Sequence, residues 1–256
     1  MAARGDGGMT TTVTIGPHRL FLGDAYAIRP ALGWMDADCM DPPYAFNNSG
    51  GGAFRKARGS SDQIVQEKLD RGFDHAIIDP ALSGAVVTFC HNDQLGEIIP
   101  AIADADQADT DALLVADMFV ALRSKFRRAA LCVWIKPNPS PMRNKHYLAD
   151  LEPYIHAWNP GYHPIGDHHD VHRHITAMPT AKKLYGHPTV KPDAVMNKII
   201  SNLSGITVCD PFMGSGSTGV AAIRAGKIFT GIEHNPKHFE TAVARCTAAF
   251  QERAAA

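Results

Sequence analysis

The stretch GITVCDPFMGSGSTGVAAIRAGKIFTGIEHNP, residues 205–236, contains the pattern that decides the fold. An apolar run at 206–209 enters a glycine-rich turn, after which residues 217–225 have the spacing of a short helix. A second apolar run, 228–232, ends on Glu233. Strand, turn, helix, strand and acid in this order predict a site for a nucleoside cofactor, because an acid at that strand end can accept hydrogen bonds from ribose hydroxyls.

An acid directly before the glycine-rich turn selects among nucleoside cofactors. Gly214, Gly216 and Gly219 satisfy the GxGxxG pattern that dinucleotide sites also use. Asp210 precedes them, and a carboxylate there repels a pyrophosphate but suits a ligand that carries an ammonium and a sulfonium. The turn therefore favours S-adenosylmethionine over NAD, and the alternative is a tight strand-to-helix turn without a ligand. The expected cofactor-binding residues here are Asp210, Pro211, Phe212, Gly214, Ser215, Gly216, Ser217, Thr218 and Glu233.

Short apolar runs and helical patterns alternate along the rest of the chain. Such alternation predicts an α/β fold in which helices cover both faces of a mostly parallel, doubly wound sheet. With 256 residues, 45% of them apolar, the chain can bury one core, so we expect a single domain at 13–256 behind a flexible tail at 1–12. The predicted strands are 37–40, 84–90, 129–135, 206–209 and 228–232, and the predicted helices are 111–126, 193–203, 217–225 and 236–250.

The formal net charge of -1 gives no sign of a nucleic-acid partner. DNA binding must therefore rest on local basic patches, each of which an ordinary solvated surface also explains. No apolar stretch approaches the roughly 18 residues of a membrane helix, and the N-terminus lacks the apolar centre of a signal peptide, so we expect a soluble, cytoplasmic protein. The patches are Arg55, Lys56 and Arg58; Arg123, Lys125, Arg127 and Arg128; and Lys136, Arg143, Lys145 and His146.

The five cysteines are scattered and form no CxxC pair. Most of them lie in apolar, strand-like runs, so we expect buried thiols rather than disulfides or metal ligands. They are Cys39, Cys90, Cys132, Cys209 and Cys246.

A tetrapeptide of Asp41, Pro42, Pro43 and Tyr44 directly follows an apolar run. Its prolines fix the backbone and remove two donors, which leaves a rigid turn that presents acceptors beside an aromatic ring. The Asp41 carboxylate and the Pro42 carbonyl can hold both hydrogens of a ring-conjugated amino group and aim its lone pair at a methyl donor. Tyr44 is expected to stack on a base that has left the duplex. Alone, the tetrapeptide fits a structural β-turn equally well; beside the glycine-rich turn it indicates catalysis.

Together, DPPY and DPFMGSGST resemble the motifs of DNA amino methyltransferases from bacterial and phage systems. The tetrapeptide precedes the cofactor turn, an order similar to that of the permuted beta class. The resemblance implies a Rossmann-like sheet of seven strands, S-adenosylmethionine as the methyl donor, double-stranded DNA as the partner and, from the class, a homodimer. It implies a target-recognition region at about 137–186, which is short for an enzyme of a restriction system.

Two further segments resemble the same family. LFLGDAYAIRPAL, residues 20–32, suggests that Asp24 lies near the adenine of the cofactor. HPTVKP, residues 187–192, is close to the family's His-Pro-Thr-x-Lys-Pro, and ordinary capping of the helix that follows is compatible with it. The residues that this segment places at the methionine end of the cofactor are His187, Thr189 and Lys191.

A histidine-rich tract, DHHDVHRH, occupies residues 167–174. Its composition allows zinc binding, but no helix or strand pattern fixes the ligand spacing, so we assign no metal site. We favour a polar loop that meets DNA, and a solvated loop is the alternative. The histidines are His168, His169, His172 and His174, and the basic residues expected to assist them are Arg173, Lys182 and Lys183.

The first residue of the tetrapeptide bears on the substrate. Asp41 resembles the adenine-N6 enzymes, whereas cytosine-N4 enzymes more often have serine there, so we expect an adenine-specific DNA methyltransferase with cytosine N4 as the alternative. Relatives that modify glutamine have Asn-Pro-Pro-Tyr after the cofactor turn, and this difference disfavours glutamine as the substrate of this chain. A non-catalytic DNA-binding regulator on the same fold is disfavoured by the intact motifs, and an NAD-dependent oxidoreductase by Asp210.

Overall fold

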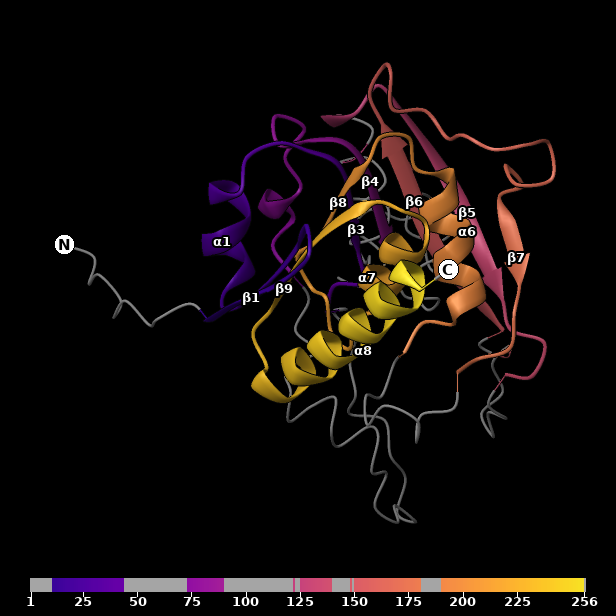
Figure 1. Cartoon of the computed structure of the whole chain (residues 1–256). Helices are drawn as coiled ribbons and strands as arrows, with labels where there is room; N and C mark the ends of the chain where they lie inside the picture. The colour runs from indigo at the N-terminus through magenta and orange to yellow at the C-terminus, as the bar shows by residue number, and fades with distance from the viewer. Residues whose placement is uncertain are drawn as a thin grey trace, which may run out of the picture.

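Figure 1 shows a computed structural model of the chain, in which one sheet runs through the molecule and helices pack against it. The N-terminal strands and the C-terminal helix α8 meet at one end of the sheet, so both ends of the described chain contribute to the same half of the molecule. The residues that the structure describes are 11–43, 73–89, 122, 125–139, 148, 150–180 and 190–255.

Nine strands form this sheet in the described part of the chain, in the order β1-β2-β9-β8-β3-β4-β6-β5-β7. The neighbours from β2 to β4 run parallel, whereas β6 is antiparallel to both β4 and β5. The strands are β1 (Thr11–Ile15), β2 (His18–Leu22), β3 (Met35–Met40), β4 (Ser83–Phe89), β5 (Arg128–Ile135), β6 (Leu151–Trp158), β7 (His174–Thr176), β8 (Thr207–Asp210) and β9 (Ile228–Glu233).

The prediction of a mostly parallel sheet of seven strands is wrong, because the sheet is mixed and contains more strands. Two short strands at the N-terminus pair as an antiparallel hairpin, and Gly16 makes the turn between them with φ of 56°. Strand β6 reads LEPYIHAW, whose acid, proline and histidine interrupt the apolar run that identified the other buried strands. β6 and β7 both lie within 137–186, the range expected to be a recognition region outside the sheet.

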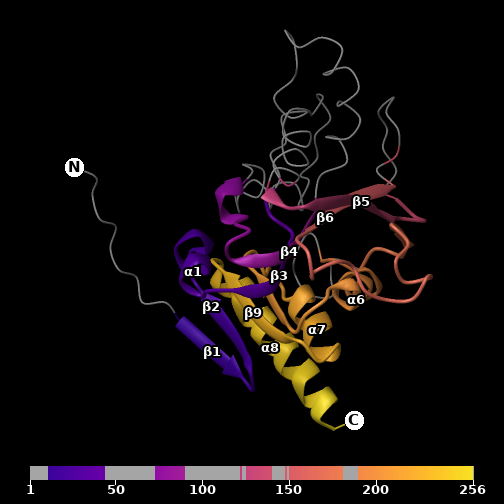
Figure 2. The same ribbon diagram turned by 90° about the horizontal axis from the view of Figure 1, so that it is seen from above.

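Helices cover both faces of the sheet, as expected. On one face α1 (Ala25–Ala31) and the 3-10 helix η1 (His75–Ile77) pack over one apolar cluster. On the other face α6 (Asp193–Asn202), α7 (Ser217–Arg224) and α8 (Pro236–Ala254) pack over a larger one. Figure 2 shows α1 and these three helices on opposite sides of the strands. Neighbouring residues of β4 alternate between the clusters, as the pleat of a strand requires.

The predicted central elements agree with the structure to within about two residues, except at the C-terminus, where α8 continues to Ala254 rather than ending near Phe250. Most of the predicted helix at 111–126 lies outside the described residues. Four cysteines, Cys39, Cys132, Cys209 and Cys246, are free and buried as expected, and Cys90 lies outside the described residues. Among the described helices, none combines the length and the apolar character needed to cross a membrane.

A buried ion pair ties α1 to the centre of the sheet. Arg29 is fully buried, and its Nε donates to Asp38 Oδ1 at 3.0 Å. Its two terminal nitrogens donate to the carbonyl oxygens of Gly33 and Leu82 at 2.9 and 2.8 Å. Because a buried guanidinium needs all of its donors satisfied, this arrangement fixes the position of β3, the strand that leads to Asp41.

A second acid of β3 fixes that strand against β8. Asp36 Oδ2 accepts hydrogen bonds from the backbone N–H groups of Ile206 and Thr207 at 2.8 and 2.9 Å. The backbone N–H of Asp36 donates in return to Thr207 Oγ1 at 2.8 Å. These contacts set the register of the two strands, so the segments that follow them leave the sheet side by side.

Candidate active site

The two sequence motifs meet at one edge of the sheet. Strands β3 and β8 are parallel neighbours in the register Ala37 to Val208, and Asp41 and Asp210 therefore emerge at the same edge. Strand β9, parallel to β8, brings Glu233 to this edge as well. We call the carboxyl ends of β3, β4, β8 and β9 the reaction edge. Open α/β sheets bind their ligands at such edges, so the topology supports the site predicted from sequence.

Gly216 in the turn after β8 and Gly219 in α7 are required by the fold of the chain itself. Gly216 precedes α7 with φ of 83°, a conformation that L side chains rarely adopt, and a Cβ there would lie 3.0 Å from Ala242 Cβ. A Cβ on Gly219 would lie 2.6 Å from Phe229 Cε1. Gly219 therefore lets α7 pack closely on β9.

Glu233 holds the glycine-rich turn in place. Its Oε2 accepts from the backbone N–H of Gly214 at 2.8 Å, and its Oε1 accepts from the N–H of Asn235 at 2.7 Å. The residue is 6% exposed and lines a cavity beside the turn. Each carboxylate oxygen can accept more than one hydrogen bond, so this bracing is compatible with the predicted contact to ribose hydroxyls.

A cavity of about 220 Å³ opens next to Glu233. We call it the Asp24 cavity, since Asp24 lines it while also capping α1 by accepting from the N–H of Tyr26 at 3.0 Å. The rings of Tyr26, Phe73 and Phe212 line it as well, and Tyr26 and Phe73 each contact Phe212 edge to face. Aromatic walls with a carboxylate on either side suit a nucleoside, whose base is apolar on its faces and whose sugar donates hydrogen bonds.

A smaller cavity of about 60 Å³, the Asp41 cavity, lies on the other side of Phe212. Asp41, Lys191 and Asp210 line it together with the turn residues Gly214, Ser215, Ser217 and Thr218. Phe212 belongs to the lining of both cavities. The two spaces are therefore adjacent along the reaction edge, one with aromatic walls and one with charged walls.

Lys191 joins Asp41 of the tetrapeptide to strand β6. Its Nζ contacts Asp41 Oδ2 and lies 3.0 Å from Glu152 Oε1 and 4.6 Å from the ring of Phe89. Glu152 in turn lies 2.6 Å from Lys136 Nζ. Positive and negative groups thus alternate from Lys136 through Glu152 and Lys191 to Asp41, so the carboxylate at the turn is paired with a buried ammonium.

The charged neighbours of Lys191 and Glu152 determine the protonation states of these two side chains. Burial lowers the pKa of Lys191, but the nearby carboxylates of Asp41 and Glu152 outweigh it and raise the pKa above its usual value. Burial likewise raises the pKa of Glu152, but Lys191 and Lys136 outweigh it and hold that pKa below its usual range. All of these shifts favour the charged forms, which keeps Lys191 an ammonium near neutral pH.

Asp210 has a different environment, because no cation is paired with it in the described structure. It is 2% exposed, and burial raises its pKa to about 7 against the opposing hydrogen bonds from Thr218 and the N–H of Phe212. The negative charges of Asp41 and Glu233 raise this pKa further. A buried carboxyl beside two other acids is stabilised as an anion by a cationic ligand, which agrees with the ligand chemistry predicted for the turn.

The predicted residues that line the two cavities are Asp24, Asp41, Pro43, Lys191, Asp210, Pro211, Phe212, Gly214, Ser215, Ser217, Thr218 and Glu233, whereas Pro42 and Gly216 are described but line neither cavity. Lys136, expected to bind DNA, is instead paired with Glu152 and only 21% exposed, whereas Arg173 is exposed within the histidine tract. Predicted residues outside the described part of the chain are Tyr44, Arg55, Lys56, Arg58, Arg143, Lys145, Lys182, Lys183, His187 and Thr189.

Sequence reasoning missed two side chains that support the site. Glu152 lies on the unpredicted strand β6, and its role follows only from the contact with Lys191. Arg245 of α8 donates from Nη1 to the carbonyl oxygen of Ser215 at 2.7 Å and so braces the glycine-rich turn from behind. Neither residue belongs to a motif. The only hint in the sequence was that each is a charged residue within an apolar pattern, which is unusual.

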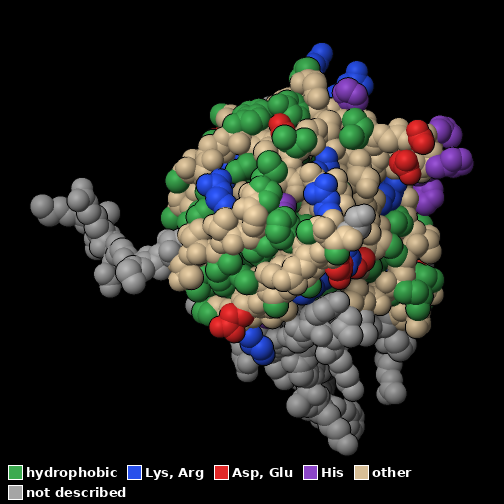
Figure 3. Space-filling view, viewed as in Figure 1, with side chains coloured by type: hydrophobic (Ala, Val, Ile, Leu, Met, Phe, Trp, Pro, Cys, Tyr) green, Lys and Arg blue, Asp and Glu red, His purple; other side chains and the backbone are tan. Residues whose placement is uncertain are grey.

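The histidine tract forms a turn before β7. The N–H of Asp170 donates to the carbonyl oxygen of Asp167 at 2.9 Å, and the centroids of neighbouring histidine rings are 5.5 to 6.3 Å apart. Figure 3 shows histidine and acidic side chains gathered at this edge of the molecule. Among the described residues, no three His, Cys, Asp or Glu side chains are grouped so as to hold a metal ion.

Known sequences with similar segments are DNA methyltransferases. The DNA adenine methyltransferase YhdJ of Escherichia coli (strain K12) is 44% identical over 61 residues, which are 23% of this chain and 21% of that protein. The type II methyltransferase M2.DpnII of Streptococcus pneumoniae is 42% identical over 64 residues, 24% of each chain. The matched part thus spans less than a quarter of the length of these curated relatives.

Solved structures of DNA methyltransferases share the fold over most of the chain. The crystal structure of the M1.HpyAVI-SAM complex superposes with a TM-score of 0.57 over 88% of this chain and 97% of that one, at 24% identity. The PvuII DNA methyltransferase (cytosine-N4-specific) has a TM-score of 0.59 over 91% of both chains, at 12% identity. At these identities the likeness establishes an α/β methyltransferase fold.

A family model described as DNA methylase matches residues 39–244. This range begins just before Asp41, ends within α8 and contains the glycine-rich turn, so it includes every element that forms the Asp41 cavity. Since the match extends over most of the 256 residues, the chain belongs to the N6_N4_Mtase family of DNA methylases.

Proposed function

We propose that this protein transfers a methyl group from S-adenosylmethionine to the N6 amino group of adenine in double-stranded DNA. One observation carries the proposal: Asp41 of the tetrapeptide and the glycine-rich turn after β8 line a single cavity at the reaction edge. A hydrogen-bond acceptor for an amino group and a binding turn for a methyl donor are thereby adjacent, which is what direct transfer to an exocyclic nitrogen requires.

The residues at the reaction edge fit the proposed cofactor. The Asp24 cavity offers aromatic walls and the Glu233 carboxylate for an adenosine, and the Asp41 cavity offers Asp210 and the hydroxyls of Ser215 and Thr218 for the charged amino-acid end. When bound, S-adenosylmethionine supplies an electrophilic methyl group on a sulfonium. The raised pKa of Asp210 supports the fit, because a buried carboxyl without a paired cation is suited to a ligand that brings positive charge.

Asp41 and Pro42 would act on the amino group. The carboxylate of Asp41 and the carbonyl of Pro42 each accept one amino hydrogen, which orients the nitrogen lone pair and increases its availability for the new N–C bond. The methylated nitrogen then loses a proton, for which the ionised carboxylate is the adjacent acceptor. Lys191 supports this role, because its ammonium holds the Asp41 carboxylate in place and favours its charged form. Tyr44, outside the described residues, is proposed to stack on the extruded base.

Adenine is favoured over cytosine by the residues and by the relatives. The tetrapeptide begins with Asp41, as in the adenine enzymes that it resembles, and the similar protein YhdJ is named a DNA adenine methyltransferase. The PvuII methyltransferase acts on cytosine N4, but at 12% identity that likeness concerns the fold alone. Cytosine N4 is therefore the alternative substrate, since the same two acceptors can hold either amino group.

Methylation in cells tests the proposed reaction directly. The protein is expressed in a host without endogenous DNA methylation, and genomic DNA is examined by modification-sensitive sequencing and by mass spectrometry of nucleosides. We expect N6-methyladenine at a short recurrent sequence. Detection of N4-methylcytosine instead would make cytosine the substrate. A complete absence of modified bases would favour a DNA-binding regulator over an enzyme.

The catalytic assignment is tested with Asp41→Ala. We expect methyl transfer to fall by about 10³-fold, because the variant removes the acceptor that orients the amino group. Binding of S-adenosylmethionine, measured by calorimetry, should stay within a few-fold, since the glycine-rich turn is untouched. Glu240→Ala is the matched control, since this acid is exposed on α8 and lines neither cavity of the reaction edge. Normal methylation by Asp41→Ala would refute the role of the tetrapeptide.

A further inference from the structure

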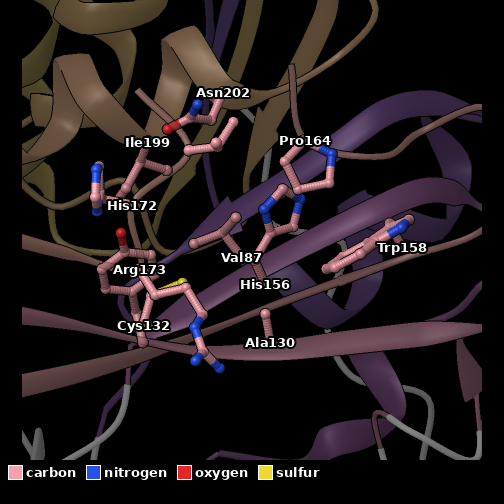
Figure 4. A pocket seen from close by; sticks show the side chains of 12 residues that line it. Val87, Ala130, Cys132, His156, Trp158, Pro164, His172, Arg173, Ile199 and Asn202 are labelled. Carbon is pink, nitrogen blue, oxygen red and sulfur yellow. The ribbon is translucent and has the colours of Figure 1, made fainter. Parts of the chain in front are cut away.

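A third cavity lies on the face of the sheet that α6 covers, away from the reaction edge. Its volume is about 220 Å³, and β4, β5 and β6 form its floor while α6 and the chain before β7 close it. We call it the lateral cavity, and Figure 4 shows its side chains pointing into a common space. The lining residues that matter below are Val87, Ala130, His156, Trp158, Asn202 and Arg173.

His156 provides the polar group of this cavity. It lies on β6 directly between Val87 of β4 and Ala130 of β5 in the register of the sheet. The residue is 6% exposed, and its Nε2 is buried without a hydrogen-bond partner among the described residues. Another buried histidine of the fold, His18, is satisfied, because its Nδ1 accepts from the N–H of Phe229 at 3.1 Å. Native proteins rarely leave such an atom unpaired, so His156 points to a missing partner.

The imidazole of His156 is neutral under ordinary conditions. Burial lowers its pKa to about 4, so at pH 7 one ring nitrogen carries a hydrogen and the other is an acceptor. A neutral imidazole can therefore donate to or accept from a ligand group without bringing a charge into the cavity.

The lateral cavity is separate from the proposed methyltransferase site. It shares no lining residue with the Asp24 or Asp41 cavity. Helix α6 gives Met196 to the Asp41 cavity but Ile199 and Asn202 to the lateral one, and β4 gives Phe89 to the former and Val87 to the latter. Different residues of the same two elements thus line the two sites.

We propose that the lateral cavity binds a second ligand, an uncharged molecule of one or two fused aromatic rings with a ring nitrogen that hydrogen-bonds to His156. Its size sets the upper limit, because a 150 Å³ cavity in another protein holds benzene and drug-sized ligands need about 300 Å³ or more. A cavity of about 220 Å³ lies between these values and suits a bicyclic ring.

The walls determine the chemistry of the ligand. The ring of Trp158 lies 5.2 Å from that of His156, and Val87, Ile199 and other apolar side chains make up most of the remaining surface. Arg173 is the charged side chain in this lining, and it is exposed at the periphery rather than buried in the cavity. An ion would therefore lose its hydration without gaining a buried partner. An uncharged ring can place its apolar surface against these walls and its one polar atom against His156.

Benzimidazole and its carbocyclic counterpart indene test the proposal. Both have a bicyclic frame of the same size, but only benzimidazole carries a donor and an acceptor nitrogen, so it can pair with either form of neutral His156. Each compound is titrated into the full-length protein at pH 7.5, and binding is followed by saturation-transfer NMR and calorimetry. We expect saturable binding of benzimidazole about tenfold tighter than that of indene, the effect of one hydrogen bond to a buried group.

Two variants locate the binding. In His156→Leu, which keeps an apolar side chain of similar length, the preference for benzimidazole over indene should disappear. In Ala130→Leu, which adds volume opposite His156, binding of both compounds should be lost, while Asp41→Ala at the reaction edge should bind them as the unmodified protein does. Absence of saturable binding, or benzimidazole binding that survives Ala130→Leu, would overturn the proposal. Because neither titration depends on methyl transfer, these results are independent of the proposed reaction.

Discussion

The reaction edge and the lateral cavity share strand β4 and helix α6, but their buried polar groups differ in charge and in pairing. At the reaction edge, Lys191 is enclosed by two carboxylates, and ionic contacts extend through Glu152 to Lys136. In the lateral cavity, the buried polar group is the neutral ring of His156, whose Nε2 has no partner among the described residues. The row from Lys136 to Asp41 keeps buried charges and pairs them, whereas the lateral cavity keeps a neutral group that has no partner among the described residues.

This difference follows from where each site lies on a sheet. Side chains beyond the ends of parallel strands meet those of neighbouring loops, so several charged groups can come together and offset the cost of removing each other from water. The described lining of the lateral cavity on the face of the sheet instead offers no buried countercharge, so a charge buried there would be unpaired. The reaction edge is therefore suited to charge and group transfer, and the lateral cavity to an uncharged ligand.

The largest effect should come from removing the cation of the reaction edge. Lys191→Met leaves the carboxylates of Asp41 and Glu152 close together without their ammonium, so we expect the free energy of unfolding to fall by about 3 kcal/mol. Denaturant titration at pH 7 measures this change. Lys237→Met, at an exposed position of α8, is the matched control and should change stability by less than about 0.5 kcal/mol. Equal effects of the two variants would mean that the row of charges does not stabilise the edge.

The next largest effect concerns the unpaired acid of the reaction edge. With a pKa of about 7, Asp210 is largely protonated at pH 5, and it must lose that proton to pair with a cationic cofactor. Affinity for S-adenosylmethionine should therefore fall as the pH is lowered, by up to about tenfold per pH unit between pH 7 and 5. Calorimetric titrations across this range measure the slope, and Asp210→Asn should bind more weakly at neutral pH but lose the slope. A slope that persists in the variant would assign it to another group.

A smaller effect is expected at Glu152, which we regard as a positioning residue that acts through Lys191. Glu152→Gln removes one of the two anions that raise the pKa of Lys191, so the ammonium should deprotonate at a lower pH and release Asp41. We expect kcat for methyl transfer to fall by about tenfold and the alkaline limb of the pH–rate profile to move to lower pH.

Glu152→Asp serves as the control for that experiment, because it retains the charge while shortening the side chain. It should keep the alkaline limb close to that of the unmodified enzyme even if kcat falls. A purely structural role of Glu152 would lower kcat in both variants and leave both profiles unshifted.

The smallest effect is expected in the lateral cavity. His156→Leu replaces an unpaired polar group by an apolar one, so stability at pH 7 should change by less than about 1 kcal/mol and methyl transfer by less than about twofold. Below pH 6.5 the variant should become the more stable protein. The folded chain resists protonation of His156 until about pH 4, whereas the unfolded chain takes up that proton near 6.5, so acid destabilises only the protein that has the histidine. Thermal unfolding at pH 7 and pH 5 checks both statements.

Much of the central fold could be predicted from sequence because its determinants are local. Residues 205–236 contain a strand, a turn, a helix and a strand in uninterrupted order, and each has a composition and periodicity of its own. Strand β6 could not be predicted in the same way, because its acid, proline and histidine obscure the apolar run. Those polar residues are tolerated there because Glu152 has Lys191 beside it and His156 faces a cavity.

The sequence by itself determined the two motifs, the type of cofactor that they favour and the edge at which they meet, since parallel strands deliver their following turns to one side of a sheet. Only the tertiary structure decided that Lys191 contacts Asp41, that Glu152 completes that pairing and that His156 lines a second cavity. The physical reason is distance along the chain: contacts within one strand-turn-helix unit leave a periodic pattern, whereas a contact between β6, the segment before α6 and the turn after β3 exists only once the sheet has brought them together.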